Sequence, residues 1–203
     1  MGKIKIGCAT DLSDKIAVVT GANTGIGFHT AKLLAKANLE TVVLACRSKE
    51  RAHSAKEEIE KFCKSGDNDN ECVVEVMELD LSDTDSINRF AKEFHKKFKR
   101  LDVLVNNAGL NMSAGYSGPK VTKQGYEMCM GTNYFGHFML TSLLLPALQK
   151  GKGTSRVVAL SSVTSWFGSN KYHYFVKGPS KTKGNYSASK LACLAMTREL
   201  QRR

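Results

Sequence analysis

Tyr186 and Lys190 stand four residues apart near the end of the chain, in the run Tyr-Ser-Ala-Ser-Lys. In a helix, this spacing places both side chains on one face. A phenol with a pKa near 10 is a poor base at neutral pH, but a cation about 4 Å away favours the phenolate by ~4 kcal/mol at an effective dielectric constant of about 20. The pair therefore predicts a tyrosine that gives and takes a proton. Because the spacing alone is common in helices, the prediction depends on what precedes it.

Polar residues in three other places would complete such a site. Ser162 follows an apolar run, the motif Asn-Asn-Ala-Gly at 106–109 ends another, and Asn133 lies in the long segment between them. Each also has an ordinary structural explanation. The motif could form a turn, Asn133 could be a polar residue on a helix, and Ser162 could cap a helix. Their order and placement together favour a ligand crevice at the carboxyl ends of strands.

A glycine-rich segment, Thr20-Gly-Ala-Asn-Thr-Gly-Ile-Gly27, stands where a predicted strand passes into a predicted helix. Glycines permit the tight turn, the close approach of backbone to a pyrophosphate and the close packing of helix against strand. The first N–H groups of the helix would face the phosphates. The spacing G-x-x-x-G-x-G differs from the commoner G-x-G-x-x-G, and a plain tight turn is the alternative. Its position between strand and helix favours a dinucleotide-binding loop.

Arg47 indicates which dinucleotide would bind. After the second strand, an acidic residue would hydrogen-bond the ribose hydroxyls of NAD, but this chain has Ala-Cys-Arg-Ser there. The guanidinium of Arg47 offers a planar fork to a 2′-phosphate, so the sequence predicts a preference for NADP(H) over NAD(H). The alternative is a surface arginine at the start of a helix. Asp80, at the end of the third predicted strand, is expected to accept a hydrogen bond from the adenine amino group.

Apolar β-branched runs and amphipathic runs alternate along the chain. Alternation of this kind predicts an α/β fold, with a doubly wound parallel sheet and helices on both faces. Ser48 and Ser82 or Asp83 are expected to cap helices. Strands are expected at residues 16–20, 41–45, 73–79, 102–106 and 156–160, and helices at 25–37, 49–64, 83–98, 123–149 and from near 187 onward.

The composition narrows the class of protein. Of 203 residues, 42% are hydrophobic and 24% are charged, as in an ordinary globular chain, and the longest apolar stretch, 138–148, is too short to span a bilayer. The formal net charge is +11, but the basic residues are spread along predicted helices, which argues against a nucleic-acid partner. The six cysteines form no C-x-x-C pair and the five histidines no metal-ligand spacing. Free thiols, a cytoplasmic location and no metal are therefore expected.

Together, these motifs resemble the short-chain dehydrogenase/reductase family, from about residue 13 to residue 203. The A-C-R-S run and the long interval between Ser162 and Tyr186 resemble its retinol-dehydrogenase-like branch, which is also similar to protochlorophyllide reductases. The resemblance implies one NAD(P)-binding Rossmann domain over residues 1–203, with NADP(H) as cofactor. The matching motifs are T-G-A-N-T-G-I-G (20–27), D-L (80–81), N-N-A-G (106–109), G-T-N-Y-F-G-H-F (131–138), S-S (161–162) and Y-S-A-S-K (186–190).

The resemblance also implies a role for each matching residue. Tyr186 would exchange a proton with the substrate oxygen, Lys190 would assist it and bond the nicotinamide ribose, and Ser162 would orient the substrate carbonyl or hydroxyl. Asn133 would position a water between Lys190 and solvent. The hydride itself belongs to the nicotinamide. The residues expected to contact the cofactor are Gly21, Asn23, Thr24, Gly25, Ile26, Gly27, Arg47, Asp80, Leu81, Asn107, Ala108, Gly109, Tyr186 and Lys190.

Two features depart from the family pattern. The interval of 24 residues between Ser162 and Tyr186 contains an insert, Trp166 to Gly184, which is either a flap over the substrate or a disordered surface loop. The family's substrate-covering parts have no match after Lys190, so we expect a form truncated after the Tyr-Lys helix, with its fifth strand as an exposed edge.

The expected function is therefore an NADP(H)-dependent oxidoreductase that transfers hydride between nicotinamide and an alcohol, ketone or aldehyde, with retinoids and steroids as candidate substrates. One alternative is a catalytically impaired NADP-binding or interaction module, because the carboxyl-terminal segment is missing. Another is a relative that performs photoreduction or epimerisation with the same Tyr-Lys pair. A homo-oligomer formed through the helices at 123–149 and 187–203 is left open.

Overall fold

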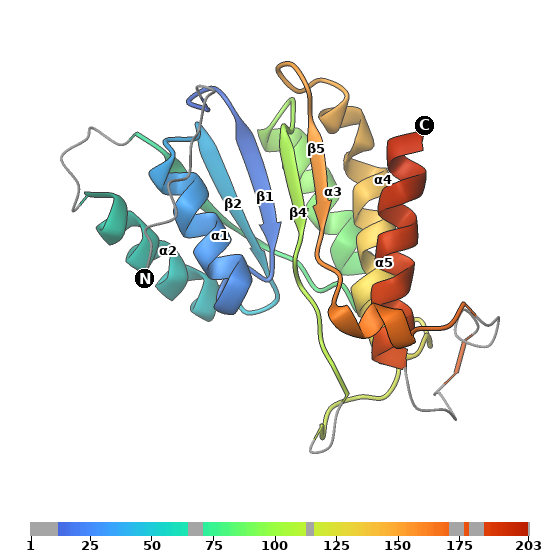
Figure 1. Ribbon diagram of the computed structural model, residues 1–203. Coiled ribbons are helices and arrows are strands. Elements are labelled where there is room, and N and C mark those ends of the chain that lie inside the picture. Colours follow the sequence, from blue (N-terminus) through green and yellow to red (C-terminus); the bar gives the residue numbers. More distant parts are fainter. Residues whose placement is uncertain (1–11, 65–70, 113–115, 171–176, 179–184, 203) are drawn as a thin grey trace, which may run out of the picture.

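Five parallel strands form the centre of the computed structural model, which describes residues 12–64, 71–112, 116–170, 177–178 and 185–202 (Figure 1). The sheet order is β3-β2-β1-β4-β5, and every neighbouring pair is parallel. This confirms the predicted doubly wound α/β architecture. The strands are β1 (Ile16–Thr20), β2 (Thr41–Cys46), β3 (Val73–Glu78), β4 (Val103–Asn106) and β5 (Arg156–Ala159).

Helices cover both faces of this sheet because successive side chains of each buried strand point to opposite sides. Ala17 and Val19 of β1 pack with helices α1 (Gly25–Lys36) and α2 (Lys49–Lys64). Ile16 and Val18 pack on the other face, with α3 (Thr84–Lys97) and α4 (His137–Leu148). The last helix, α5 (Asn185–Arg202), packs against residues 130–136, which lead into α4, and against β5 (Figure 1).

The predicted helix over 123–149 begins five residues too early, at residue 123 rather than 128. Residues 122–125 instead make a turn in which Gly125 has φ +85°. The carboxylate of Glu127 then accepts the N–H groups of Cys129 (3.0 Å) and Met130 (2.8 Å), so this acid starts the helix. A π-helical segment, η1 (Met130–Gly136), leads into α4. All other predicted boundaries lie within two residues of those observed.

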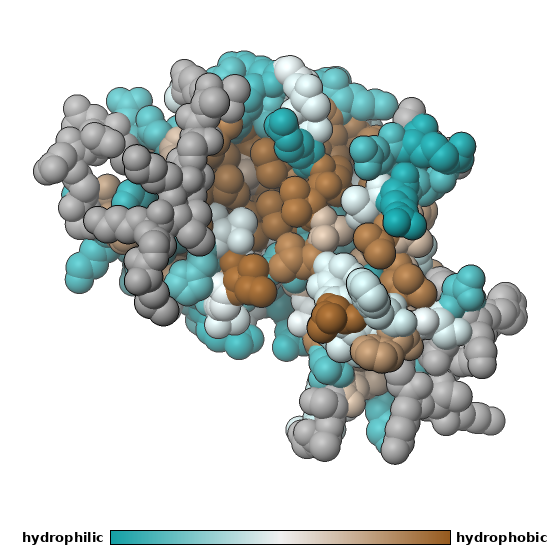
Figure 2. All heavy atoms as spheres, viewed as in Figure 1, coloured by the Kyte–Doolittle hydropathy of each residue, from teal (hydrophilic) through white to brown (hydrophobic). Residues whose placement is uncertain are grey.

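β5 is an edge strand of this sheet. Apolar side chains gather over β4 and β5, on the part of the sheet that α1 and α2 leave open (Figure 2), and Val158 there is 44% exposed. After β5 comes a short 3₁₀ helix, η2 (Val163–Phe167). Most of the predicted insert (171–176 and 179–184) lies outside the described residues, so its two interpretations stay open. None of the described helices is both long and apolar enough to cross a membrane.

Candidate active site

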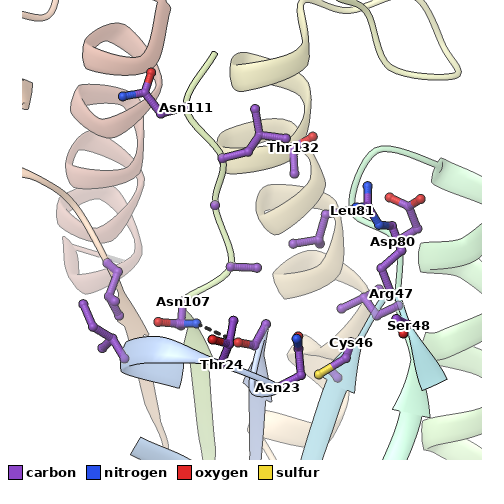
Figure 3. A pocket seen from close by; sticks show the side chains of 18 of the residues that line it. Asn23, Thr24, Cys46, Arg47, Ser48, Asp80, Leu81, Asn107, Asn111 and Thr132 are labelled. Carbon is purple, nitrogen blue, oxygen red and sulfur yellow. Dashed lines mark hydrogen bonds between the residues drawn. The ribbon is translucent and has the colours of Figure 1, made fainter. Parts of the chain in front are cut away.

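A cavity of about 530 Å³ opens at the carboxyl ends of the strands (Figure 3). Its volume is in the range of small-molecule sites, and its position is where parallel α/β sheets bind ligands. It brings together 12 of the 14 residues predicted to contact the cofactor, and the two others are Gly25 and Gly27. The 12 are Gly21, Asn23, Thr24, Ile26, Arg47, Asp80, Leu81, Asn107, Ala108, Gly109, Tyr186 and Lys190.

The glycine turn between β1 and α1 admits no larger residue at two positions. Gly21 has φ +64°, and a Cβ there would lie 3.0 Å from Ala108. A Cβ on Gly27 would lie 2.3 Å from Nδ2 of Asn107 and 2.6 Å from the carbonyl oxygen of Gly21. Asn107 cannot easily move away, because its Nδ2 donates to the carbonyl of Thr20 at 2.7 Å. The glycines thus let helix, turn and the end of β4 approach closely, which is the backbone cradle that a pyrophosphate requires.

The amino terminus of α1 is suited to bind an anion. Thr24 is its N-cap but makes no side-chain capping hydrogen bond, and the first turn contains no acidic residue. The first N–H groups of a helix have no partner within the helix, and the helix dipole adds positive potential there. This end of α1 borders the cavity through Thr24 and Ile26, so it fits a cofactor phosphate.

Two arginines stand at the far end of the cavity, at the start of α2. Arg47 and Arg51 both line it and are exposed, and no carboxylate among the described residues pairs with either guanidinium. Lys49 is different, because its Nζ lies 3.0 Å from Glu78. Ser48 caps α2, as predicted, by accepting the N–H of Arg51 at 3.3 Å. Sequence reasoning missed Arg51, although its position one helical turn beyond Arg47 was the available signal.

Asp80 lies beside Arg47 at this end of the cavity (Figure 3). Its Oδ1 accepts hydrogen bonds from the N–H (2.8 Å) and the hydroxyl (2.6 Å) of Ser82. Ser86 accepts the N–H of Asp80 at 3.0 Å. These contacts orient the carboxylate, and no described residue bonds Oδ2, which is therefore available to a ligand donor such as an adenine amino group.

Tyr186 and Lys190 occupy the opposite wall, on the first turns of α5. Nζ of Lys190 lies 5.8 Å from the centre of the Tyr186 ring and donates to the carbonyl of Leu160 at 2.9 Å. Lys190 is only 5% exposed, and burial lowers the pKa of this amine below its ordinary value. The pair thus meets in the cavity as the spacing predicted, with a desolvated cation next to a phenol.

Ser162 and Asn133 do not line the described cavity. Ser162 is the N-cap of η2, where its Oγ accepts the N–H (3.2 Å) and the hydroxyl (3.0 Å) of Thr164. Asn133 is fully buried in η1. Its side chain bonds both backbone groups of Leu110, at 2.9 and 3.0 Å, and the hydroxyl of Ser189 at 3.0 Å. In the structure, Ser162 therefore caps a helix, and Asn133 joins the end of β4 to α5.

Sequence reasoning gave no role to the other lining residues, although Cys46, Ser161 and Thr132 lie within the quoted motifs. Burial raises the pKa of the Cys46 thiol to about 11, so this group is neutral and unreactive at physiological pH. Ser161 lines the cavity, but its hydroxyl donates to the carbonyl of Lys190 at 2.8 Å. Asn111 and Thr132 also line the cavity (Figure 3). Within the described ranges, no three His, Cys, Asp or Glu side chains are grouped to hold a metal ion.

Comparisons with known proteins agree with this geometry. A family model described as short chain dehydrogenase matches residues 15–203. Mouse "Retinol dehydrogenase 11" is 43% identical over 193 residues, which is 95% of this chain and 57% of the relative. Human "Retinol dehydrogenase 12" is 42% identical over 199 residues, or 97% of this chain and 59% of the relative. The chain thus spans somewhat under three fifths of the length of these relatives.

Solved structures give the same result. The NADP active-site complex of RhlG from Pseudomonas aeruginosa has a TM-score of 0.72 at 26% identity, covering 95% of this chain and 68% of that one. A short chain dehydrogenase from Shigella flexneri, complexed with NADP, has a TM-score of 0.70 at 27% identity and covers 95% and 73%. The structure-based and sequence-based comparisons therefore point to one family.

Proposed function

The chain belongs to the short-chain dehydrogenase family, and from this premise we propose that it is an oxidoreductase that uses NADP(H) to interconvert an alcohol and an aldehyde or ketone. One observation supports this above all: a single cavity has an anion-binding helix terminus and two unpaired arginines at one end, and Tyr186 with Lys190 at the other. The retinol dehydrogenases among the relatives favour an apolar, retinoid-like alcohol or aldehyde as substrate.

The preference for NADP(H) over NAD(H) rests on Arg47 and Arg51. An NAD-specific site would place a carboxylate after β2 to bond the ribose hydroxyls, and that carboxylate would repel a 2′-phosphate. Here the position holds Arg47, and Arg51 stands one turn further along α2. Since neither guanidinium forms a direct ion pair with a described carboxylate, a phosphate would gain two charge-assisted interactions that a plain hydroxyl cannot make.

The remaining roles follow from the protein's own side chains. When bound, the nicotinamide supplies or takes up the hydride. In the reductive direction, the Tyr186 hydroxyl donates its proton to the substrate oxygen, and the Lys190 ammonium stabilises the phenolate that remains. Ser162 accepts two hydrogen bonds from Thr164, so its own hydroxyl hydrogen is available to orient the substrate oxygen. Asn133 joins Leu110, in the segment after β4, to Ser189 on α5.

The experiment compares cofactor affinity and turnover in matched variants. We expect Arg47→Asp to raise the Kd of NADPH by about 10- to 100-fold, since hydrogen bonds to charged groups contribute about 1.5–3 kcal/mol, with little effect on NADH. Lys49→Asp is the control, because Lys49 is held by Glu78 and makes no contact with the cavity. An unchanged ratio of the NADPH and NADH affinities in Arg47→Asp would reject the arginine assignment.

Turnover is followed as loss of NADPH absorbance with all-trans-retinal and with smaller aldehydes and ketones. Tyr186→Phe is expected to remove turnover while the Kd of NADPH stays within about twofold, since the phenol acts on the reacting oxygen. Turnover retained by Tyr186→Phe would contradict the assignment of the proton donor. Tight NADPH binding without hydride transfer to any of these carbonyls would instead favour the non-catalytic binding module.

A further inference from the structure

His137, the first residue of α4, touches two segments of the site although it does not line the cavity. It is 2% exposed. Its Nδ1 lies 2.9 Å from the carbonyl oxygen of Asn133, and its Nε2 lies 2.9 Å from the hydroxyl of Thr20. Thr20 is the last residue of β1 and is 117 residues away in sequence. The imidazole thus bridges η1 and the start of the glycine turn.

The chemistry of the partners determines where each hydrogen lies. A carbonyl oxygen only accepts, so Nδ1 must carry the proton that bonds Asn133. Burial lowers the pKa of His137 to about 4, and the nearby Lys190 cation acts in the same direction. The ring is therefore neutral, its Nε2 is an acceptor, and the Thr20 hydroxyl donates to it.

The Thr20 hydroxyl then has no free hydrogen-bonding capacity. Its oxygen accepts the N–H groups of Asn107 and Ala108, both at 2.9 Å. A hydroxyl has one hydrogen and two lone pairs. The two lone pairs accept these N–H groups, and the hydrogen has two acceptors within reach: Nε2 of His137 at 2.9 Å and, further away, the carbonyl of Val105 at 3.3 Å. The shorter contact assigns it to His137. The Nδ1–H tautomer of His137 is the form that lets Thr20 hold both N–H groups at the end of β4, where Asn107 and Ala108 line the cofactor cavity.

Asn133 continues this connection to the Tyr-Lys helix. Its amide nitrogen donates to the hydroxyl of Ser189, and Ser189 donates to the carbonyl of Tyr186 at 2.7 Å. Its carbonyl also accepts from the thiol of Cys193 at 3.2 Å. A chain of buried hydrogen bonds therefore runs from the cofactor turn, through Thr20, His137 and Asn133, to α5.

We propose that His137, as the neutral Nδ1–H tautomer, is a positioning residue that fixes the cofactor turn at Asn107–Ala108 relative to the Tyr186–Lys190 helix. This proposal rests on the proposed function. In that function His137 contacts neither the cofactor nor the reacting atoms, so it acts only by holding other residues in position. Its two nitrogens have separate tasks: Nε2 orders the turn through Thr20, and Nδ1 orders the catalytic helix through Asn133.

Two substitutions separate these tasks. The amide of asparagine corresponds to the Nδ1 position and that of glutamine to the Nε2 position, so each keeps one hydrogen bond and loses the other. We expect His137→Asn to raise the Kd of NADPH about tenfold, because a buried hydroxyl partner is lost. We expect His137→Gln to keep that Kd within about twofold and to lower kcat about tenfold instead.

His95→Gln is the matched control. The His95 ring bonds the carbonyl of Leu143 at 2.9 Å, between α3 and α4 and away from the cavity, so it should change the melting temperature only. A purely structural role for His137 would give both variants lower melting temperatures with the same Kd and kcat as wild type, and that result would overturn the proposal.

A second measurement needs no cofactor. The ¹⁵N chemical shifts of the His137 ring in the unliganded chain should report a protonated Nδ1 and an unprotonated Nε2 near neutral pH. The opposite tautomer would overturn the proposal regardless of activity. If the wild-type chain failed to bind NADPH, the proposed function would fall, while this spectrum would still decide whether the hydrogen-bond chain exists.

Discussion

Gly27→Ala tests whether the close contact between α1 and β4 holds the cofactor turn in place. The new methyl group would lie 2.3 Å from Nδ2 of Asn107 and 2.6 Å from the carbonyl oxygen of Gly21. Neither neighbour is a flexible chain end: one is backbone, and the other is pinned by hydrogen bonds to Thr20 (2.7 Å) and Gly21 (3.4 Å). Helix and turn must therefore move apart by about 1 Å to restore ordinary van der Waals contact.

The cost follows from these contacts. Overpacking a closely packed site costs about 1–3 kcal/mol, and two weakened hydrogen bonds cost about 1 kcal/mol each. Alanine recovers about 1 kcal/mol as the better helix former. The free energy of unfolding should fall by about 2–4 kcal/mol, and the melting temperature by about 4–16 °C for a chain of this size. Because the displaced groups are those that would face the pyrophosphate, the Kd of NADPH should rise at least tenfold.

Urea denaturation and NADPH fluorescence titration measure the two effects separately. Gly153→Ala is the control, since Gly153 has φ +78° but a Cβ there meets no atom within 4 Å. It should lose about 1 kcal/mol through the left-handed backbone conformation and leave the Kd of NADPH unchanged. If Gly27→Ala were as stable as wild type and bound NADPH equally well, the claim that this contact shapes the site would be refuted.

Three further predictions concern buried or capping groups. The folded-state pKa of His137 is about 4 and its ordinary value 6.5, so the unfolded chain takes up this proton first and the folded state loses stability as the pH falls from about 6.5 to 4. His137→Gln should make the loss over that range smaller by about 3 kcal/mol in urea titrations, and an identical slope would contradict it. Lys190→Met should abolish turnover but unfold at the same or a higher urea concentration than wild type, because the substitution removes a cation that burial disfavours. A clear loss of stability would show instead that the hydrogen bond to Leu160 dominates. Asp83 caps α3 by accepting the N–H of Asp85 at 2.9 Å, so Asp83→Ala should lose about 1 kcal/mol and Asp83→Asn much less, and equal losses would argue against capping.

Local patterns were sufficient for most of the architecture. The apolar runs predicted all five strands, and their alternation with amphipathic runs predicted a parallel sheet covered on both faces. The cap at Ser48 was also predicted, and Asp83 was one of two candidates for the cap of α3, because a short polar side chain before an amphipathic run is itself a local signal. The start at residue 128 of the helical segment that leads through η1 into α4 was not, since it depends on the turn at Gly125 and on the carboxylate of Glu127, whose capping role leaves no periodic pattern.

For the site, the sequence by itself determined which residue types were available and in what order: the glycines of the turn, Arg47 after β2, and a tyrosine and lysine one helical turn apart. Only the tertiary structure decided what each side chain faces. In the structure, Arg51 lines the cavity and Ser162 caps η2. The tertiary structure also set His137 against Thr20, 117 residues away. The physical reason is the distance along the sequence. Secondary-structure propensity and hydrophobic periodicity report on residues a few positions apart, whereas these contacts join residues that are distant in sequence and meet where parallel strands end side by side.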